Sequence, residues 1–138
     1  MTRMKKSMLT VTMAAIGAFG CAIALAAEVN VKLSGDSEVP PVKSAGAGGG
    51  KLMVGDDGSI SGSVMTTGIA GMAAHIHMGA AGKNGPVILP LTKEGDSYKV
   101  PAGSKLNPDQ LKAFKAGDLY VNVHTPENKG GELRGQLK

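Results

Sequence analysis

Thiols and aromatic rings are scarce in this 138-residue chain, and both shortages exclude classes of function. The one cysteine, Cys21, lies in an N-terminal apolar segment that we interpret below as a removable export signal. The rest of the chain therefore forms no disulfide, thiolate nucleophile, iron–sulfur cluster or blue-copper centre. It has no tryptophan, and its aromatic residues are Tyr98, Phe114 and Tyr120. These rings are too few for a surface on which single-stranded nucleic acid stacks.

An excess of charge of one sign is also nearly absent once the N-terminal segment is set aside. The whole chain has a formal net charge of +4, to which Arg3, Lys5 and Lys6 contribute. The rest carries 12 basic and 11 acidic residues, a net charge of +1. Because phosphate binding requires a clustered basic face, this balance argues against a nucleic-acid partner.

The first 27 residues have the organisation of a secretory signal peptide. A basic segment, residues 1–6, precedes an uncharged apolar segment, residues 8–25, and Ala24-Leu25-Ala26 offers the small-x-small pattern of a cleavage site. An uncleaved membrane anchor and a lipoprotein attached at Cys21 are the alternatives. We expect residues 1–27 to be removed and residues 28–138 to form a single periplasmic or secreted domain, with no membrane segment after cleavage.

The remaining chain divides into short alternating or β-branched runs separated by Gly, Pro, Asn and Asp. About seven or eight such runs at regular spacing predict an all-β fold, an antiparallel immunoglobulin-like or Greek-key β-sandwich. The glycine-rich residues 44–50 are expected to form a loop or a bulged entry to a strand. The expected strands are Val29–Leu33, Lys51–Val54, Ser59–Thr66, Ala73–Met78, Val87–Leu91, Ser97–Val100, Leu119–His124 and Glu132–Leu137.

One short helix is predicted over residues 107–116. Asn107 is a favoured N-cap residue, Pro108 suits the first helical position, and Gly117 is placed to end the helix in the left-handed conformation. Leu111 and Phe114 would face the core of the sandwich.

All three histidines lie in the predicted domain, and two of them form the pattern Ala74-His75-Ile76-His77. Side chains two residues apart leave a strand on the same face, so His75 and His77 project together. His124 ends another predicted strand and would join them if the two strands pair. Imidazole suits copper and zinc. A metal site at His75, His77 and His124 is the functional hypothesis, and histidines with only a structural role are the alternative.

Two further expectations concern side chains around this region. Glu38 is expected to accept a bidentate ion pair from Arg134, which would pin a strand or loop. Met72 and Met78 are expected to fill the core rather than to bind metal.

Three sequence blocks together resemble the CHRD domain, the module named after chordin. The resemblance implies a β-sandwich similar to immunoglobulin domains, and its paired-histidine and His-Thr motifs correspond to His75, His77 and His124. Growth-factor binding is not implied, because the cysteine-rich repeats that accompany the module in animals are absent. The blocks are residues 33–42, residues 74–87 and residues 119–136.

The leading functional hypothesis is therefore an exported, non-enzymatic domain that binds a transition metal, with copper favoured and zinc as the other candidate. A protein-interaction or adhesion module with an envelope or extracellular partner is the first alternative. A metalloenzyme with three histidine ligands and an open coordination position is the second. Its general acid or base would be Glu38 or Glu132.

Overall fold

The structure is a computed structural model that describes residues 26–138. The predicted signal peptide, residues 1–27, lies outside the described residues except for Ala26 and Ala27. Among the described residues, no helix is both long enough and apolar enough to span a membrane.

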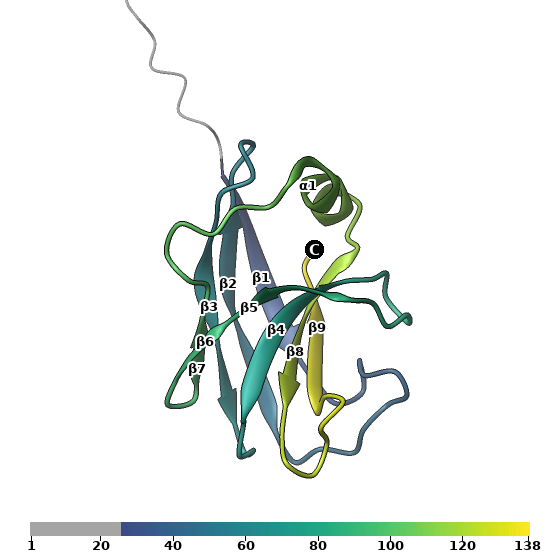
Figure 1. Cartoon of the computed structure of the whole chain (residues 1–138). Coiled ribbons are helices and arrows are strands. Elements are labelled where there is room, and N and C mark those ends of the chain that lie inside the picture. The colour runs from purple at the N-terminus through teal and green to yellow at the C-terminus, as the bar shows by residue number, and fades with distance from the viewer. Residues whose placement is uncertain (1–25) are drawn as a thin grey trace, which may run out of the picture.

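Two antiparallel sheets stack face to face, and a short helix lies at one end of the stack (Figure 1). The five-stranded sheet has the order β1-β2-β3-β7-β6, and its strands are β1 (Ala27–Leu33), β2 (Ala47–Val54), β3 (Ile60–Thr67), β7 (Ser97–Lys99) and β6 (Thr92–Glu94). The four-stranded sheet has the order β5-β4-β8-β9, and its strands are β5 (Val87–Pro90), β4 (Ala73–Met78), β8 (Leu119–His124) and β9 (Leu133–Gln136). The predicted all-β sandwich is confirmed.

The core lies between the two sheets and consists almost entirely of aliphatic side chains. Burial alternates along β1, where every second residue from Val29 is buried, as a half-buried strand requires. On β4, Ala74 and Ile76 face this core, and the histidines on either side of Ile76 face the opposite way. The residues that face inward from β8 are Leu119, Val121 and Val123.

The sheets are joined at both edges. At one edge, Ser34, which follows β1, and Arg134 of β9 exchange two backbone hydrogen bonds of 3.1 and 3.0 Å. At the other edge the chain runs from β5 directly into β6, and the Leu91 N–H donates to the Ala74 carbonyl. The first link fixes the position of β9 against β1.

The helix α1 (Pro108–Lys115) forms where the sequence predicts it. The Asn107 side chain accepts from the Gln110 N–H, and the Gln110 side chain accepts in return from the Asn107 N–H. Gly117 follows the helix with a φ of +80°. Leu111 and Phe114 are partly buried against the core, as expected.

Two local predictions were wrong. Of the glycine-rich residues 44–50, the first three lie outside any strand, but residues 47–50 form the regular start of β2. Glycine is needed there because β3 lies so close: a Cβ on Gly50 would collide with the Ser63 carbonyl oxygen. The second error is the omission of β6, Thr92–Glu94. All three of its residues are exposed at a sheet edge, so no apolar alternation identifies it.

Replacing Ile76 with alanine tests the assignment of the core. Ile76 is fully buried between the sheets, so Ile76→Ala is expected to lower the free energy of unfolding by about 2–5 kcal/mol. Met65→Ala is the matched control, because Met65 on β3 is 58% exposed; it should change stability by less than about 0.5 kcal/mol. Urea denaturation of both variants measures the difference, and equal costs would contradict the assignment.

Candidate metal centre

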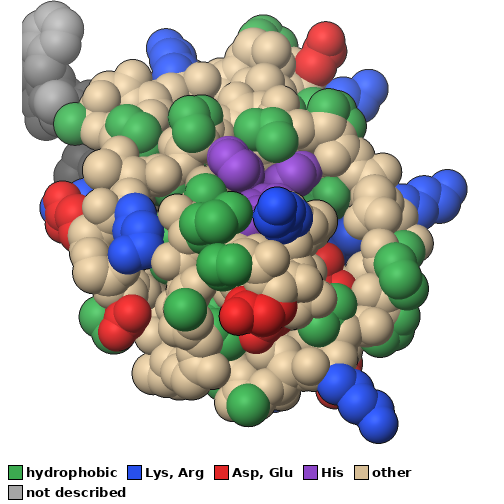
Figure 2. All heavy atoms as spheres, turned by 60° about the horizontal axis from the view of Figure 1, so that its bottom comes forward, with side chains coloured by type: hydrophobic (Ala, Val, Ile, Leu, Met, Phe, Trp, Pro, Cys, Tyr) green, Lys and Arg blue, Asp and Glu red, His purple; other side chains and the backbone are tan. Residues whose placement is uncertain are grey.

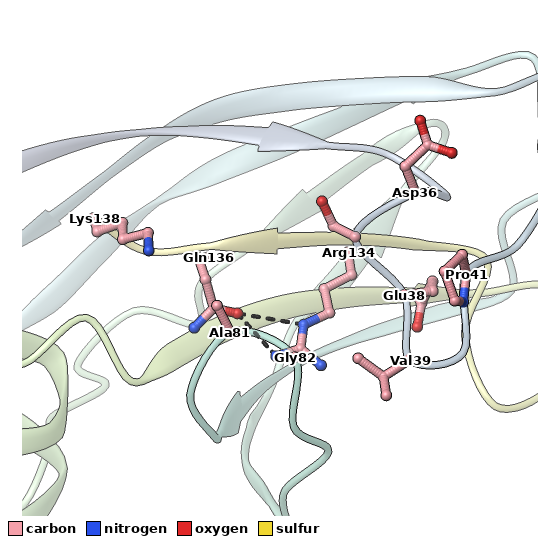
Figure 3. Close-up of a pocket in the computed structure, with 10 residues that line it drawn as sticks. Asp36, Glu38, Val39, Pro41, Ala81, Gly82, Arg134, Gln136 and Lys138 are labelled. Carbon is pink, nitrogen blue, oxygen red and sulfur yellow. Dashed lines mark hydrogen bonds between the residues drawn. The ribbon is translucent and has the colours of Figure 1, made fainter.

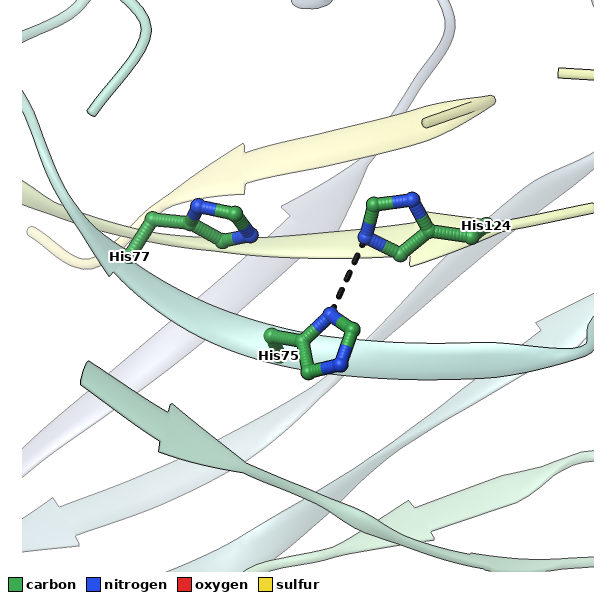
Figure 4. Close-up of side chains that lie close together, drawn as sticks. All are labelled: His75, His77 and His124. Atoms are coloured by element: carbon green, nitrogen blue, oxygen red, sulfur yellow. Dashed lines mark hydrogen bonds between the residues drawn. The ribbon is translucent and has the colours of Figure 1, made fainter. Parts of the chain in front are cut away.

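The pairing of β4 with β8 brings the three histidines together on the outer face of the four-stranded sheet. Ala73 is opposite His124 and His75 is opposite Asn122 in this antiparallel register. The His75 and His124 rings have centroids 4.9 Å apart, and His77 lies 5.9 Å from His75 and 6.2 Å from His124 (Figure 4). The predicted convergence of His124 on the His75/His77 pair is confirmed. Figure 2 shows the three side chains gathered at one place on the surface.

Hydrogen bonds assign the position of the proton on each ring. His77 Nδ1 lies 2.9 Å from the Gly85 carbonyl oxygen, and His124 Nδ1 lies 2.8 Å from the Lys129 carbonyl oxygen. A carbonyl oxygen only accepts, so both Nδ1 atoms carry protons, and each neutral ring has its lone pair on Nε2. His75 Nδ1 lies 3.1 Å from His124 Nε2 and donates to it.

The segment between β4 and β5 holds His77. Residues 79–86 lie on the outer face of the sheet, where Gly85 accepts from His77 and its N–H donates to the Tyr120 hydroxyl over 3.0 Å. Gly85 must be glycine, because a Cβ there would lie 1.7 Å from the Met78 carbonyl oxygen. A carbonyl that fixes the orientation of a histidine is a common outer contact of metal ligands.

The turn after β8 holds His124 in a similar way. The Glu132 carboxylate accepts from Thr125 over 2.8 Å, from Asn128 over 3.0 Å and from the Ser44 hydroxyl. The Ser44 hydrogen bond is the main reason that the pKa of Glu132 is lower than usual, and those from Thr125 and Asn128 contribute further. Glu132 thus stabilises the turn that presents the Lys129 carbonyl to His124.

Burial favours the neutral form of His75 and His77. It lowers the pKa of His75 and of His77, and the neighbouring histidines lower both pKa values further. For His77, the hydrogen bond to Gly85 opposes this shift. His77 is only 8% exposed, and its Nε2 is a buried atom without a hydrogen-bond partner. A buried lone pair without a donor is energetically costly, so this atom is where a cation would be stabilised.

The three rings form a group that could hold a metal ion, since one nitrogen from each ring lies within 4.8 Å of the others. Three nitrogens about 2.0–2.1 Å from a common ion lie roughly 3.3–4.1 Å apart, so small movements of the side chains would bring the three rings onto one ion. His75 must also release its Nδ1 proton or move it to Nε2. The donor set is all nitrogen, which suits copper or zinc better than calcium or magnesium.

Sequence reasoning missed the contribution of Tyr120. Its ring is stacked on His77, with centroids 4.8 Å apart and an angle of 7° between the planes. The Arg134 guanidinium, which comes from the strand on the other side of β8, lies 3.5 Å from the centre of the same ring. The three side chains therefore form one stack, in the order His77, Tyr120, Arg134. The alternation along residues 119–124 did place Tyr120 on the face of His124, but a stack across three strands has no signature in the sequence.

The expected ion pair between Glu38 and Arg134 was wrong. In the part of the chain that the structure describes, the only salt bridge within 4.0 Å joins Lys51 and Glu28. Arg134 instead donates a 2.9 Å hydrogen bond to the Ala80 carbonyl. A second, also of 2.9 Å, goes to Gln136 Oε1 (Figure 3). The cover formed by residues 79–86 supplies neutral acceptors for the guanidinium, so a carboxylate is not needed to keep it buried.

The two methionines next to the histidine strand differ. Met78 is partly buried against the core, as predicted. Met72 is 50% exposed, so its expected role in the core was wrong: it precedes β4 at the end of the sheet, where no second layer covers it.

In a comparison with protein-family models, the model of the CHRD domain matches residues 29–137. No curated protein and no solved structure has a significant match to the chain. The matched residues include both strands that carry the histidines.

The ionisation of Glu38 is expected to make the protein less stable as the pH rises. Burial raises the pKa of Glu38 from 4.5 to about 7, although Arg134 acts in the opposite direction. The folded state then binds more protons than the unfolded state between these values, so stability is lost from about pH 4.5 upward and is lowest above the folded pKa. The free energy of unfolding of Glu38→Gln should therefore rise relative to that of the wild type by roughly 2 kcal/mol between about pH 4 and about pH 8.

Urea denaturation across this range measures the effect. The other ionisable groups are the same in both proteins, so their contributions cancel in the difference. Glu28→Gln, which removes an exposed carboxylate, is the control and should give a difference that changes by less than about 0.5 kcal/mol. If the free energy of unfolding changes with pH in the same way in Glu38→Gln and in the wild type, the ionisation of Glu38 does not affect stability and the prediction is wrong.

Proposed function

Because the chain belongs to the CHRD domain family, with a match over nearly the whole described chain, we propose that it is an exported, non-enzymatic domain that binds a transition metal ion through His75, His77 and His124. Copper is the favoured ion, and zinc is the other candidate. The proposed export rests on the signal-peptide pattern of residues 1–27.

One observation carries the metal proposal. The Nε2 atom of His77 is buried without a partner, beside two other imidazoles whose protons are placed by neighbouring groups. Histidines with a purely structural role would make the same bonds to the Gly85 and Lys129 carbonyls. They would not leave a buried nitrogen unpaired, because an unsatisfied buried acceptor costs about 1–3 kcal/mol. A metal ion would satisfy this atom.

The ligand chemistry favours copper. Copper(II) forms the most stable complexes of the divalent first-row metals with nitrogen ligands, and imidazole suits both copper and zinc. The Glu132 carboxylate, which would add an oxygen ligand, accepts three hydrogen bonds in the turn after β8. Neither Glu132 nor Glu38 makes a hydrogen bond with a histidine, which gives the catalytic alternative little support.

Calorimetric titration of the purified protein with Cu(II) and with Zn(II) tests the proposal. We expect one Cu(II) ion per chain with a dissociation constant below about 10 μM, which corresponds to roughly −7 kcal/mol. His75→Ala/His77→Ala is expected to weaken binding at least about 100-fold, since each histidine lost removes a ligand. Electron paramagnetic resonance of the Cu(II) complex should show nitrogen coupling from the histidine ligands.

Met72→Ala is the matched control, because its side chain is a potential copper ligand that lies outside the cluster; binding should be unchanged. His124→Ala provides a second loss-of-ligand variant if the double variant does not fold. The proposal fails if neither ion binds more tightly than about 10 μM and the histidine variants titrate like the wild type.

Gly85→Ala tests whether the segment over the sheet positions His77. The added Cβ would collide with the Met78 carbonyl, so the Gly85 carbonyl must move away from His77 Nδ1. The expected result is metal binding that is about 10–100-fold weaker, as for other outer contacts of metal ligands. Gly130→Ala is the control, because its Cβ would meet no atom within 4 Å. Unchanged affinity in Gly85→Ala would show that the carbonyl does not orient the ligand.

A further inference from the structure

A second candidate site lies in a cavity of about 510 Å³ beside β9, and none of the histidines lines it. Its walls come from the segment after β1, from the cover segment at Ala81 and Gly82, and from the side chains of β9 (Figure 3). Val39, Pro41 and Ala81 form an apolar part of the lining. A cavity with apolar walls and a few polar groups is the usual form of a small-molecule site.

Two ionisable side chains of the lining are almost completely buried. Arg134 is 1% exposed and Glu38 is 5% exposed. They lie next to each other along the cavity without an ion pair within 4.0 Å. The adjacent charged groups of the lining are Asp36, from the same segment as Glu38, and Lys138, which follows β9.

Both buried groups have unused hydrogen-bonding capacity. Arg134 Nε and Nη2 donate to Gln136 and to the Ala80 carbonyl, but Nη1 makes only one bond, a long one of 3.5 Å to Asn84 Oδ1. The Oε1 atom of Glu38 is buried and has no partner. Buried polar groups are normally satisfied, so unused groups of both residues at one cavity point to a ligand.

A carboxylate satisfies both residues at once. Its oxygens accept from Arg134 Nη1, and a protonated Glu38 donates to them through its carboxyl O–H. The raised pKa of Glu38 makes this protonated form accessible near neutral pH. A neutral amide or alcohol would offer Arg134 Nη1 only an uncharged acceptor, which a guanidinium binds more weakly than a carboxylate.

We propose that this cavity binds a small organic carboxylate, whose oxygens are held by Arg134 and Glu38 and whose apolar part lies against Val39 and Pro41. The site does not depend on metal at the histidines. Where Glu38 is ionised before binding, the complex takes up one proton at its carboxyl, because only the protonated form donates to the ligand carboxylate.

Nuclear magnetic resonance titration with butyrate and with butyramide, which has the same shape but no charge, tests this proposal. Butyrate is expected to shift the amide signals of Ala81 and Gly82 in a saturable way at concentrations up to about 10 mM, as suits so small a ligand. Because burial raises the pKa of Glu38 to about 7, butyrate should bind about tenfold more tightly at pH 6 than at pH 8. Butyramide should bind more weakly at pH 6.

Variants separate the roles of the two residues. Glu38→Gln keeps a donor at every pH, so butyrate should still bind and the tenfold pH dependence should disappear. Arg134→Lys is expected to weaken butyrate binding at least tenfold. If that variant does not fold, Glu38→Gln still decides the question. His124→Ala removes a proposed metal ligand but leaves the hydrogen bond between His77 and the Gly85 carbonyl intact. This variant should bind butyrate as the wild type does, which distinguishes this site from the proposed metal site.

Three results would overturn the proposal. The first is the absence of a saturable shift with butyrate at about 10 mM. The second is equal affinity for butyrate and butyramide at pH 6. The third is a pH dependence that persists in Glu38→Gln.

Discussion

Hydrogen bonds from strand side chains to the backbone of residues 79–86 are the constraint on which the functional face depends. Arg134 donates to the Ala80 carbonyl, Gln136 to the Gly79 carbonyl, and His77 to the Gly85 carbonyl. They hold the segment flat on the outer face of the four-stranded sheet. The part of the sheet beneath this segment is consequently buried on both faces, although its outer face is polar: Tyr120 and Arg134 are each 1% exposed.

Residues 79–86 contact side chains of both candidate sites. On one side of Tyr120, the Gly85 carbonyl accepts from His77 Nδ1 and so holds the proton of this ring on Nδ1. The lone pair on His77 Nε2 therefore has no hydrogen-bond partner and faces the other two imidazoles. On the other side the segment accepts from Arg134 with neutral carbonyls, so the guanidinium keeps its charge without a carboxylate partner. Polar groups buried in this manner are costly unless satisfied, and the proposed ligands are the species that would satisfy them.

The sequence predicted the elements with local signals. Asn107, Pro108 and Gly117 act within one helix, so its limits could be predicted closely. Alternation placed His75 and His77 on one face for the same reason. The glycines of β2 were misjudged because glycine is required there by the close backbone of another strand, which the local sequence does not show. The Glu38–Arg134 pair was misjudged because Arg134 donates to a backbone carbonyl, a group that every residue carries.

By itself, the sequence determined that the domain is a thiol-free β-sandwich with two imidazoles on one strand face, since composition and a two-residue period follow from covalent geometry. Whether the third imidazole reaches them depended on the register between β4 and β8, a contact between residues nearly fifty positions apart. The tertiary structure alone also decided which nitrogen atoms have free lone pairs, because carbonyls brought in by two loops hold the protons on the opposite side of the rings.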